Sequence, residues 1–363
     1  MKSHTPVCCI LPPHILVKLS ENPAYRDRAM RNLMLTEQLR GRRTVLGVMS
    51  ALAIAAGQER RTIYDDQHGG STSLPGQLVR GEGDNPTADD AVNEAYDYSG
   101  DTYDFYQQVF GRNSIDNRGM RLDSSVHYET DYDNAFWNGQ QMVYGDGDGQ
   151  FFQRFTICLD VVGHELTHGV TASTAQLEYQ GESGALNESF SDVFGSLVKQ
   201  RKLGQSANEA DWLIGAGMFT PNVNGTALRS MAAPGTAYDD PNIGKDPQPA
   251  DMSGFDPQGD VHTNSGIPNH AFYLAAMKIG GNAWEKPGLI WYRTLTERLQ
   301  PTSSFQDAAD LTVAVAGEQF GAGGLEQKSV QQAWQEVGIS PSIATAVRIP
   351  VAAAYPQAEQ PAA

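Results

Sequence analysis

The sequence predicts an α+β protein with two lobes, a β-rich N-terminal lobe and a mainly helical C-terminal lobe. Residues 62–155 alternate polar and apolar side chains and are rich in glycine, aspartate and asparagine, which is typical of strands joined by turns. From about residue 156 onward, apolar side chains recur three and four residues apart, as in amphipathic helices. The run His164-Glu165-Leu166-Thr167-His168 falls at this change, so we expect its helix between the lobes, at the floor of a cleft.

The N-terminal segment, residues 1–43, differs in charge from the rest of the chain. It holds 8 basic and 3 acidic side chains, whereas the whole chain has a net charge of -17. A basic segment before an acidic body suggests that the two dock electrostatically. Asn22-Pro23 reads as the start of a helix, with asparagine as the cap and proline in the first turn.

Within the body, the periodicity predicts individual elements in order. The expected strands are 125–128 and 141–144, and the expected helices are 188–198, 268–277 and 329–336. Residues 344–363 are rich in alanine, proline and glutamine, and they read as an unstructured extension.

The spacing of two histidines predicts a zinc site. His164 and His168 are four residues apart, so both imidazoles lie on one face of a helix and can reach one metal ion, with Glu165 beside the remaining coordination position. A catalytic zinc takes three protein ligands, and we assign Glu188 as the third. Asp192, four residues further on, is expected to accept a hydrogen bond from a ligating histidine, His164 in the first place. The competing interpretation is that Glu188 and Asp192 are ordinary solvated helix charges.

Composition excludes several other classes of protein. The negative net charge argues against nucleic acid as a partner. No apolar run approaches the ~20 residues that span a membrane. Only Cys158 lies outside the N-terminal segment, so no internal disulfide framework is expected and this thiol should lie in the core. The N-terminus does not look like a standard secretory signal, which leaves export by an atypical route or an intracellular location open.

Residues 162–170, around His164 and His168, and residues 184–192, around Glu188, together resemble the thermolysin family of neutral zinc metallopeptidases. Three further blocks match this family in order, at 134–137, 177–180 and 259–266. The resemblance spans roughly residues 60–340 and implies a thermolysin-like fold, one zinc ion, peptide or protein substrates and a monomeric enzyme. It divides the chain into a β-rich lobe with the zinc helix, 51–180, and a helical lobe, 181–343.

The resemblance also assigns roles residue by residue. Glu165 matches the general base that activates a zinc-bound water, and Tyr179 and His262 match the groups that stabilise the oxyanion. Asp260 matches the carboxylate that orients His262, and Asn187 a residue that supports the zinc ligands. Substrate binding is implied for Asn134, Ala135 and Arg229, which would hold the peptide backbone. Five residues resemble the wall of an apolar pocket that prefers a bulky hydrophobic residue after the cut bond: Phe152, Phe155, Val161, Ile214 and Leu228.

The N-terminus resembles the short prosegment of the protealysin-like branch of this family, on the strength of Pro12-Pro13-His14-Ile15-Leu16. A prosegment of residues 1–50, with its boundary between Arg43 and Arg61, would act as an intramolecular inhibitor that the enzyme removes by self-cleavage. Two ways of blocking the cleft stay open. A thiolate of Cys8 or Cys9 could occupy the open zinc position, or packing alone could suffice.

The chain departs from the family at a double calcium site. Asp160 and Asp211 match two of its carboxylates, but Lys199, Leu213 and Ala216 stand where three others are expected. Calcium needs several hard oxygen ligands, so we predict that this site is absent and that Lys199 pairs with Asp160, Asp211 or both. The run Asp146-Gly147-Asp148-Gly149 has two interpretations, a calcium loop or a tight turn between strands, and Asp-Gly pairs favour the turn.

Two readings from other classes remain. One is a catalytically silent zinc protein that binds but does not cut, and the other is a zinc hydrolase acting on a non-peptide amide. The presence of Glu165, Tyr179 and His262 argues against the first, and the backbone-binding Asn134 and Ala135 argue against the second.

Overall fold

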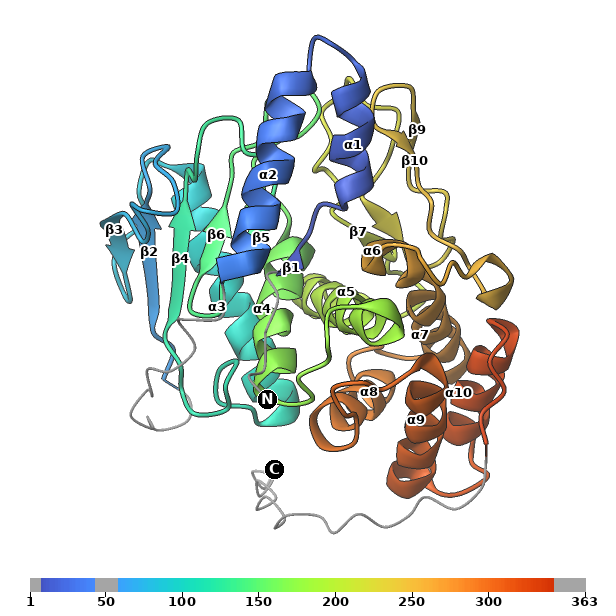
Figure 1. Ribbon diagram of the computed structural model, residues 1–363. Coiled ribbons are helices and arrows are strands. Elements are labelled where there is room, and N and C mark those ends of the chain that lie inside the picture. Colours follow the sequence, from blue (N-terminus) through green and yellow to red (C-terminus); the bar gives the residue numbers. More distant parts are fainter. Residues whose placement is uncertain (1–7, 43–57, 343–363) are drawn as a thin grey trace.

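The computed structural model describes residues 8–42 and 58–342, and it has the expected α+β architecture (Figure 1). One sheet of six strands forms the core of the N-terminal lobe, in the order β1-β5-β6-β4-β2-β3. Its strands are β1 (Cys8–Cys9), β2 (Arg61–Asp65), β3 (Gln77–Gly81), β4 (Leu122–Val126), β5 (Ala135–Trp137) and β6 (Met142–Tyr144). Two short pairs lie apart from it, β7 (Leu213–Ile214) with β8 (Arg229–Ser230), and β9 (Asp239–Asp240) with β10 (Gly244–Lys245).

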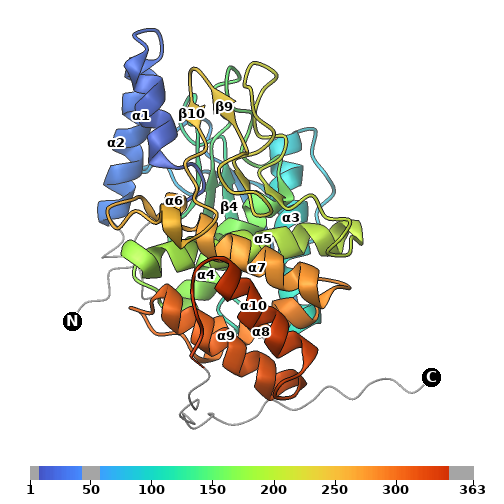
Figure 2. The same ribbon diagram turned by 90° about the vertical axis from the view of Figure 1, so that its right-hand side faces the viewer.

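Helices make up the C-terminal lobe and surround the sheet (Figures 1 and 2). The helices before the C-terminal lobe are α1 (Pro13–Glu21), α2 (Arg26–Arg42), α3 (Asp90–Phe110) and α4 (Leu159–Ser173). Those that follow are α5 (Gly181–Leu203), α6 (Val261–Asn264), α7 (Gly266–Ile279), α8 (Lys286–Glu297), α9 (Phe305–Phe320) and α10 (Leu325–Glu336), with a 3-10 turn at Met252–Gly254. Within the described residues, no helix is long and apolar enough to cross a membrane.

The three helices expected in the C-terminal part are present, and each is longer than its apolar stripe indicated. The stripe at 188–198 lies inside α5, 268–277 inside α7 and 329–336 inside α10. Each helix begins a few residues before its stripe, at Gly181, Gly266 and Leu325. The extension at 344–363 lies outside the described residues.

The region 62–155 is β-rich as expected, but it also contains the helix α3, 21 residues long, which the alternation of side chains did not indicate. Asp89 caps this helix by accepting hydrogen bonds from the backbone of Ala91 and Val92. Its buried side chains recur three and four residues apart, a helical period that the many polar and aromatic residues obscured: Ala91, Val92, Ala95, Tyr96, Ser99, Thr102, Tyr103 and Tyr106. The expected strand 125–128 also ends early, because His127 takes a positive φ of 56°.

The N-terminal segment folds against the body as a strand and a helical hairpin, drawn in blue in Figure 1. Strand β1 extends the sheet by pairing antiparallel with β5, Cys9 opposite Phe136. Figure 2 shows α1 and α2 packed together at one edge of the molecule, with β9 and β10 beside them. The cap Asn22 holds the turn between the helices through Ala24, so α2 begins at Arg26, a few residues later than the sequence indicated, and α1 was not anticipated.

Two glycines let the helices of the expected zinc site approach closely. A Cβ atom on Gly195 of α5 would lie 2.3 Å from the carbonyl oxygen of Asp160 and 3.0 Å from the amide nitrogen of His164, both on α4. A Cβ atom on Gly163 of α4 would lie 3.1 Å from the Cα of Gly195. Since no side chain separates the two backbones, residues on α4 and α5 can point at one shared position.

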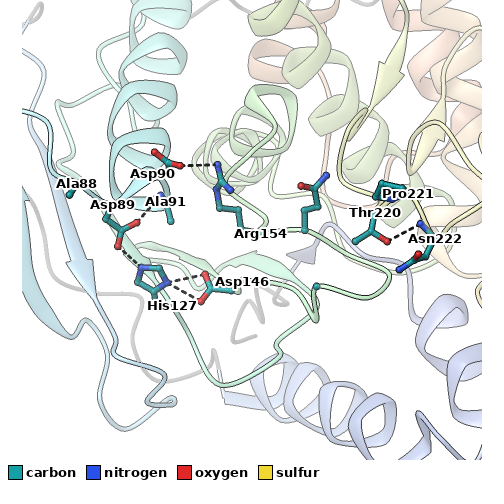
Figure 3. A pocket seen from close by; sticks show the side chains of 12 residues that line it. Ala88, Asp89, Asp90, Ala91, His127, Asp146, Arg154, Thr220, Pro221 and Asn222 are labelled. Atoms are coloured by element: carbon teal, nitrogen blue, oxygen red, sulfur yellow. Dashed lines mark hydrogen bonds and ion pairs between the residues drawn. The ribbon is translucent and has the colours of Figure 1, made fainter.

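His127 joins two parts of the N-terminal lobe, as Figure 3 shows. Its Nε2 lies 2.8 Å from Asp89 Oδ2, at the start of α3, and its Nδ1 lies 2.9 Å from Asp146 Oδ2. The hydrogen bond to Asp146 raises the pKa of His127 to about 9, with a further contribution from Asp89 that outweighs the opposing effect of burial.

This raised pKa predicts a loss of stability at alkaline pH. The charged imidazole stabilises the fold fully below the unfolded pKa of about 6.5, and this contribution is lost as pH rises through about 9. We expect the unfolding free energy to fall by about 1–2 kcal/mol more in the parent chain than in His127→Gln between pH 6 and pH 10. Chemical denaturation at both pH values measures this difference. An equal change in unfolding free energy between pH 6 and pH 10 for the two chains would contradict the prediction.

Candidate metal centre

Three buried side chains from α4 and α5 converge on one position. His164 and His168 come from α4 and Glu188 comes from α5, and one ligand atom of each lies within 4.8 Å of the others. The two Nε2 atoms are 3.0 Å apart, and Glu188 lies 3.4 Å from His164 and 3.5 Å from His168. Among the described residues, this is the one such cluster of histidine, cysteine and carboxylate groups.

Hydrogen bonds on the far side of each ring orient the two histidines. Nδ1 of His164 lies 2.8 Å from Asp192 Oδ1, which is the contact expected from the sequence. Nδ1 of His168 lies 2.9 Å from Asn187 Oδ1 and 3.1 Å from Ser191 Oγ. With both Nδ1 atoms engaged, both Nε2 atoms face the shared position, as metal-ligating histidines require. Ser191 was not anticipated, because it lies next to Asp192 and its residue type offers no separate signal.

The residues present fit a zinc ion. Two imidazoles and one carboxylate form the ligand set typical of a catalytic zinc with an open fourth position. Glu188 Oε2 is buried and makes no hydrogen bond, which is unfavourable for a carboxylate oxygen unless a cation binds it. The charges of His262, His168 and His164 outweigh the effect of burial and hold the pKa of Glu188 well below its usual range, so it is ionised as a ligand must be.

Asp192 lies at the centre of a buried polar network behind the site. It accepts two hydrogen bonds of 2.8 Å from Arg229 and one of 2.8 Å from Asn269, in addition to its contact with His164. Burial opposes the charge on Asp192, but Arg229 and His164 outweigh it and lower its pKa to about 2. The network thereby fixes His164 and places the Arg229 guanidinium at the edge of the site. Asn269 was not anticipated, because it lies inside the apolar pattern of α7.

A second group of side chains lies across the site from α4. Nδ1 of His262 is 2.5 Å from Asp260 Oδ1, and its Nε2 is 3.3 Å from the Tyr179 hydroxyl, which in turn donates a hydrogen bond to Glu188. Burial opposes the charge on His262, but Glu188 and Asp260 outweigh it and raise its pKa. Tyr179 and His262 thus bring two polar hydrogens next to the ligand cluster, as their expected roles require.

Glu165 is fully buried beside the ligand cluster, between α4 and the sheet. Its Oε2 accepts a hydrogen bond of 3.1 Å from the backbone amide of Trp137 on β5. This contact ties the carboxylate to the strand that pairs with the N-terminal segment. Glu165 therefore lies next to the strand along which the N-terminal segment runs.

The N-terminal segment runs along β5 as an extended peptide would. Ile10 donates its amide hydrogen to the carbonyl oxygen of Ala135 at 3.3 Å, and Leu11 donates to Asn134 Oδ1 at 3.0 Å. The carbonyl oxygen of Cys9 lies 2.7 Å from His262 Nε2, and that of Ile10 accepts a hydrogen bond of 3.0 Å from Arg229. The residues expected to bind substrate backbone therefore bind this segment.

Comparison with known proteins agrees with the geometry. Residues 52–172 match the model of the thermolysin metallopeptidase catalytic domain, and residues 175–339 match that of its alpha-helical domain. The chain belongs to the thermolysin family of metallopeptidases. It is therefore a zinc metalloendopeptidase by family, and its helix–sheet division follows the family's two domains.

Similar proteins cover nearly the whole chain. An extracellular metalloprotease of Pectobacterium carotovorum subsp. carotovorum is 49% identical over 93% of this chain and 98% of its own length. Protease PrtS of Photorhabdus sp. (strain Az29) is 45% identical over 91% of each chain. The solved precursor of protealysin, a metalloproteinase from Serratia proteamaculans, is 50% identical with a TM-score of 0.83, covering 92% of this chain and 100% of that one. The chain is thus similar to the solved precursor of a metalloproteinase.

The thiol of Cys9 does not act as a zinc latch in this peptidase. Its side chain is fully buried in an apolar cluster with Tyr128, Tyr132, Phe136 and Val143, and its carbonyl oxygen, not its sulfur, approaches the site. Backbone contacts and packing therefore fill the cleft. The side chain of Cys8 lies outside the described part of the chain. Cys158 is buried as expected, and burial raises the pKa of its thiol well above the usual value.

The five residues expected to form the pocket wall are all buried in the main apolar core of the peptidase: Phe152, Phe155, Val161, Ile214 and Leu228. Ile10 of the N-terminal segment belongs to the same cluster and is itself fully buried. The side chain of Ile10, the first after the Cys9–Ile10 bond, therefore packs in the same apolar core as these five residues.

Lys199 makes the predicted ion pairs. Its ammonium lies 2.7 Å from Asp160 Oδ2 and 2.9 Å from Asp211 Oδ1, and it donates a third bond to the carbonyl oxygen of Leu213. Burial opposes the charge on Lys199, but the two carboxylates outweigh it and raise its pKa. The ammonium thus neutralises carboxylates that calcium would otherwise need to bind.

Removing the Lys199 ammonium is expected to lower the unfolding free energy of the peptidase. In Lys199→Met the Asp160 side chain, 2% exposed, would lose its cation, which we expect to cost about 2–4 kcal/mol of unfolding free energy. Lys202→Met is the matched control, because Lys202 is 55% exposed in its pair with Asp101 and should change stability by less than about 1 kcal/mol. Urea denaturation compares the three chains, and equal losses for the two variants would contradict the account.

Proposed function

We propose that this chain is a self-processing zymogen of a neutral zinc endopeptidase, which cuts peptide bonds on the N-terminal side of bulky hydrophobic residues. One observation carries the proposal: the backbone of residues 9–11 lies on β5 with its carbonyl oxygens at His262 and Arg229. A peptide substrate in the same place would present the carbonyl at the position of Cys9 to His262, and the side chain of its next residue to the apolar core. The N-terminal segment thus acts as an inhibitor by occupying the place of substrate.

The chemistry follows from the positions of this chain's own groups. His164, His168 and Glu188 would hold a zinc ion, which when bound polarises the scissile carbonyl and acidifies a water molecule. Glu165 is placed to take the water's proton and to pass it to the leaving amine. Tyr179 and His262, held by Asp260, are placed to donate hydrogen bonds to the oxygen on which negative charge develops.

Binding of an extended peptide is the role we assign to the remaining groups. Asn134 and Ala135 pair with backbone on the edge of β5, and Arg229 donates to the carbonyl one residue after the cut bond. These three groups contact backbone after the Cys9–Ile10 bond, and β5 also pairs with the two residues before it. Binding of backbone on both sides of one peptide bond favours an endopeptidase over a hydrolase of small amides. Filled positions at Glu165, Tyr179 and His262 favour catalysis over mere zinc binding.

The preference for a hydrophobic residue after the cut bond can be measured directly. We expect the processed enzyme to cut peptides with Leu, Ile or Phe at that position about 10-fold to 200-fold faster, in kcat/KM, than the same peptides with Ala. Mass spectrometric mapping of a set that differs in this one residue gives the comparison. Equal rates across the set would contradict the pocket assignment.

Blocking by the N-terminal segment predicts a lag in activity. The freshly purified chain should hydrolyse a peptide slowly at first and faster as the segment is lost. Ile10→Asp places a charge in the apolar core, so it should loosen the segment and shorten the lag. Val17→Asp is the control, since Val17 lies in the same segment but is 51% exposed. A lag unchanged by Ile10→Asp would contradict inhibition through this contact.

A further inference from the structure

A second contact between the N-terminal segment and the body lies away from the zinc ligands, beneath α2. Arg28 of α2 donates a hydrogen bond to Asp148 Oδ2, and its Nε lies 4.0 Å from Asp133 Oδ2. Asn32, one turn further along α2, donates to the carbonyl oxygen of Asp131 at 3.1 Å and to Asp133 Oδ2 at 3.2 Å. Three acceptors of the body, two carboxylates and one carbonyl, thus meet α2 at the same place.

The two carboxylates need a positive charge between them. The side chains of Asp133 and Asp148 are 1% and 0% exposed, and two carboxylates buried together repel each other unless a cation compensates them. Arg28 supplies that charge while α2 is in place. Removal of α2 takes away the charge and both hydrogen-bond donors at once, but leaves every acceptor on the body.

The place is built to hold a cation. Asp148 Oδ1 accepts hydrogen bonds of 2.9, 2.7 and 2.9 Å from the backbone amides of Gln150, Phe151 and Phe152, which fixes the carboxylate and leaves Oδ2 toward Arg28. Asp133 Oδ1 is buried and makes no hydrogen bond, even with α2 bound. Burial and the charge of Asp148 raise the pKa of Asp133 well above its usual range, which is the mark of a carboxylate that lacks a sufficient cation.

We propose that Asp133, Asp148 and the carbonyl of Asp131 form a calcium site in the processed enzyme, and that Arg28 occupies it in the zymogen. The inference rests on the proposed function, since it requires that α2 leave the body on maturation. It also gives a role to Asp148 of the Asp146-Gly147-Asp148-Gly149 run, as a calcium ligand. That run does not form a tight turn between strands, because β6 ends at Tyr144 and the chain continues toward α4.

The ligand atoms select calcium among common cations. All three are oxygens, and neither imidazole nor thiolate is among them, which disfavours zinc and other transition metals. Calcium accepts carboxylate and carbonyl oxygens in flexible geometry and completes its shell with water, whereas magnesium demands a regular octahedron. The side-chain amide of Gln150, whose present partner is the Tyr25 hydroxyl of the N-terminal segment at 2.9 Å, is a fourth group released when that segment departs.

Calcium titration of the full-length chain tests the site without relying on self-cleavage. Glu165→Gln prevents processing, so α2 stays on the body, and this chain serves as the baseline. We expect Glu165→Gln/Arg28→Ala to bind one more calcium ion than the baseline by isothermal titration in zinc-containing buffer, and Asp133→Asn added to it to remove that ion. Arg31→Ala is the matched control, because Arg31 lies in α2 with an exposed side chain and should add no calcium.

A second measurement uses the naturally processed chain. Wild-type enzyme that has shed its N-terminal segment should contain one more calcium than the Glu165→Gln chain, and Asp133→Asn should lack it after processing. Equal calcium content in all these chains would overturn the proposal. If the wild type sheds nothing, the proposed function fails, whereas the Arg28→Ala titration still decides the calcium site by itself.

Discussion

Glu165→Gln is expected to lower kcat/KM for peptide hydrolysis by about 10³-fold to 10⁴-fold, because a positioned general base contributes on that order. The amide has nearly the shape of the carboxylate but cannot take a proton, and Glu165 is fully buried beside the zinc ligands. The variant should be compared after its N-terminal segment has been removed by added wild-type enzyme. Once the added wild-type enzyme has been removed, initial rates on a fluorogenic peptide measure the chemistry of the variant alone.

Zinc content is the control for this variant. Glu165 is not among the three converging ligands, so Glu165→Gln should retain one zinc ion per chain while losing activity. Activity within a few-fold of wild type would show that another group is the base. Loss of zinc together with activity would show that Glu165 acts on the ligand cluster and not on the substrate.

Asp192→Ala should have the second largest effect, on both stability and zinc. It leaves the Arg229 guanidinium, 1% exposed, without a counter-ion, which we expect to cost about 3–5 kcal/mol of unfolding free energy. It also releases His164, so zinc affinity should fall by about 10-fold to 100-fold. Denaturant unfolding and zinc competition with a chelator measure the two effects separately.

The double variant Asp192→Leu/Arg229→Met separates the two causes. Removing both charges leaves no buried ion unpaired, so this chain should be more stable than Asp192→Ala, while its zinc affinity should stay low. Equal stability of the two chains would show that the ion pair contributes little. Full zinc affinity in Asp192→Ala would show that the hydrogen bond to His164 is dispensable.

The sequence predicted the metal centre well because its geometry is local. His164 and His168 share one helix face, and Glu188 and Asp192 share another, so spacing places the members of each pair together. The two pairs then meet because α4 and α5 pack closely at Gly163 and Gly195. The ion pairs of Lys199 were predicted equally well. An ammonium that stands where the family has a carboxylate, beside Asp160 and Asp211, is most stable when it pairs with these two acidic groups. These are contacts whose partners are set by residue type and by regular secondary structure.

Contacts between distant segments could not be predicted in this way. Nothing in Cys9 or Ile10 indicates pairing with β5, since two-residue strands have no periodicity and their register depends on the docked hairpin. Arg28 reads as one of several basic residues in α2, and only the fold brings it to Asp133 and Asp148. Charge asymmetry indicated that the segment docks, but not where. Helix α3 was missed because its buried face includes polar and aromatic residues such as Ser99, Thr102 and Tyr103, which obscure the helical period in the sequence.

Intact mass of the purified chain, followed over time beside Glu165→Gln, tests the central claim most directly. The account predicts that the wild type alone sheds an N-terminal piece ending between Arg43 and Arg61, and that peptide hydrolysis rises in step with the loss. A Glu165→Gln chain that sheds the same piece at the same rate would contradict self-processing through this site. So would a wild-type chain that keeps the segment and nevertheless shows full activity from the first measurement.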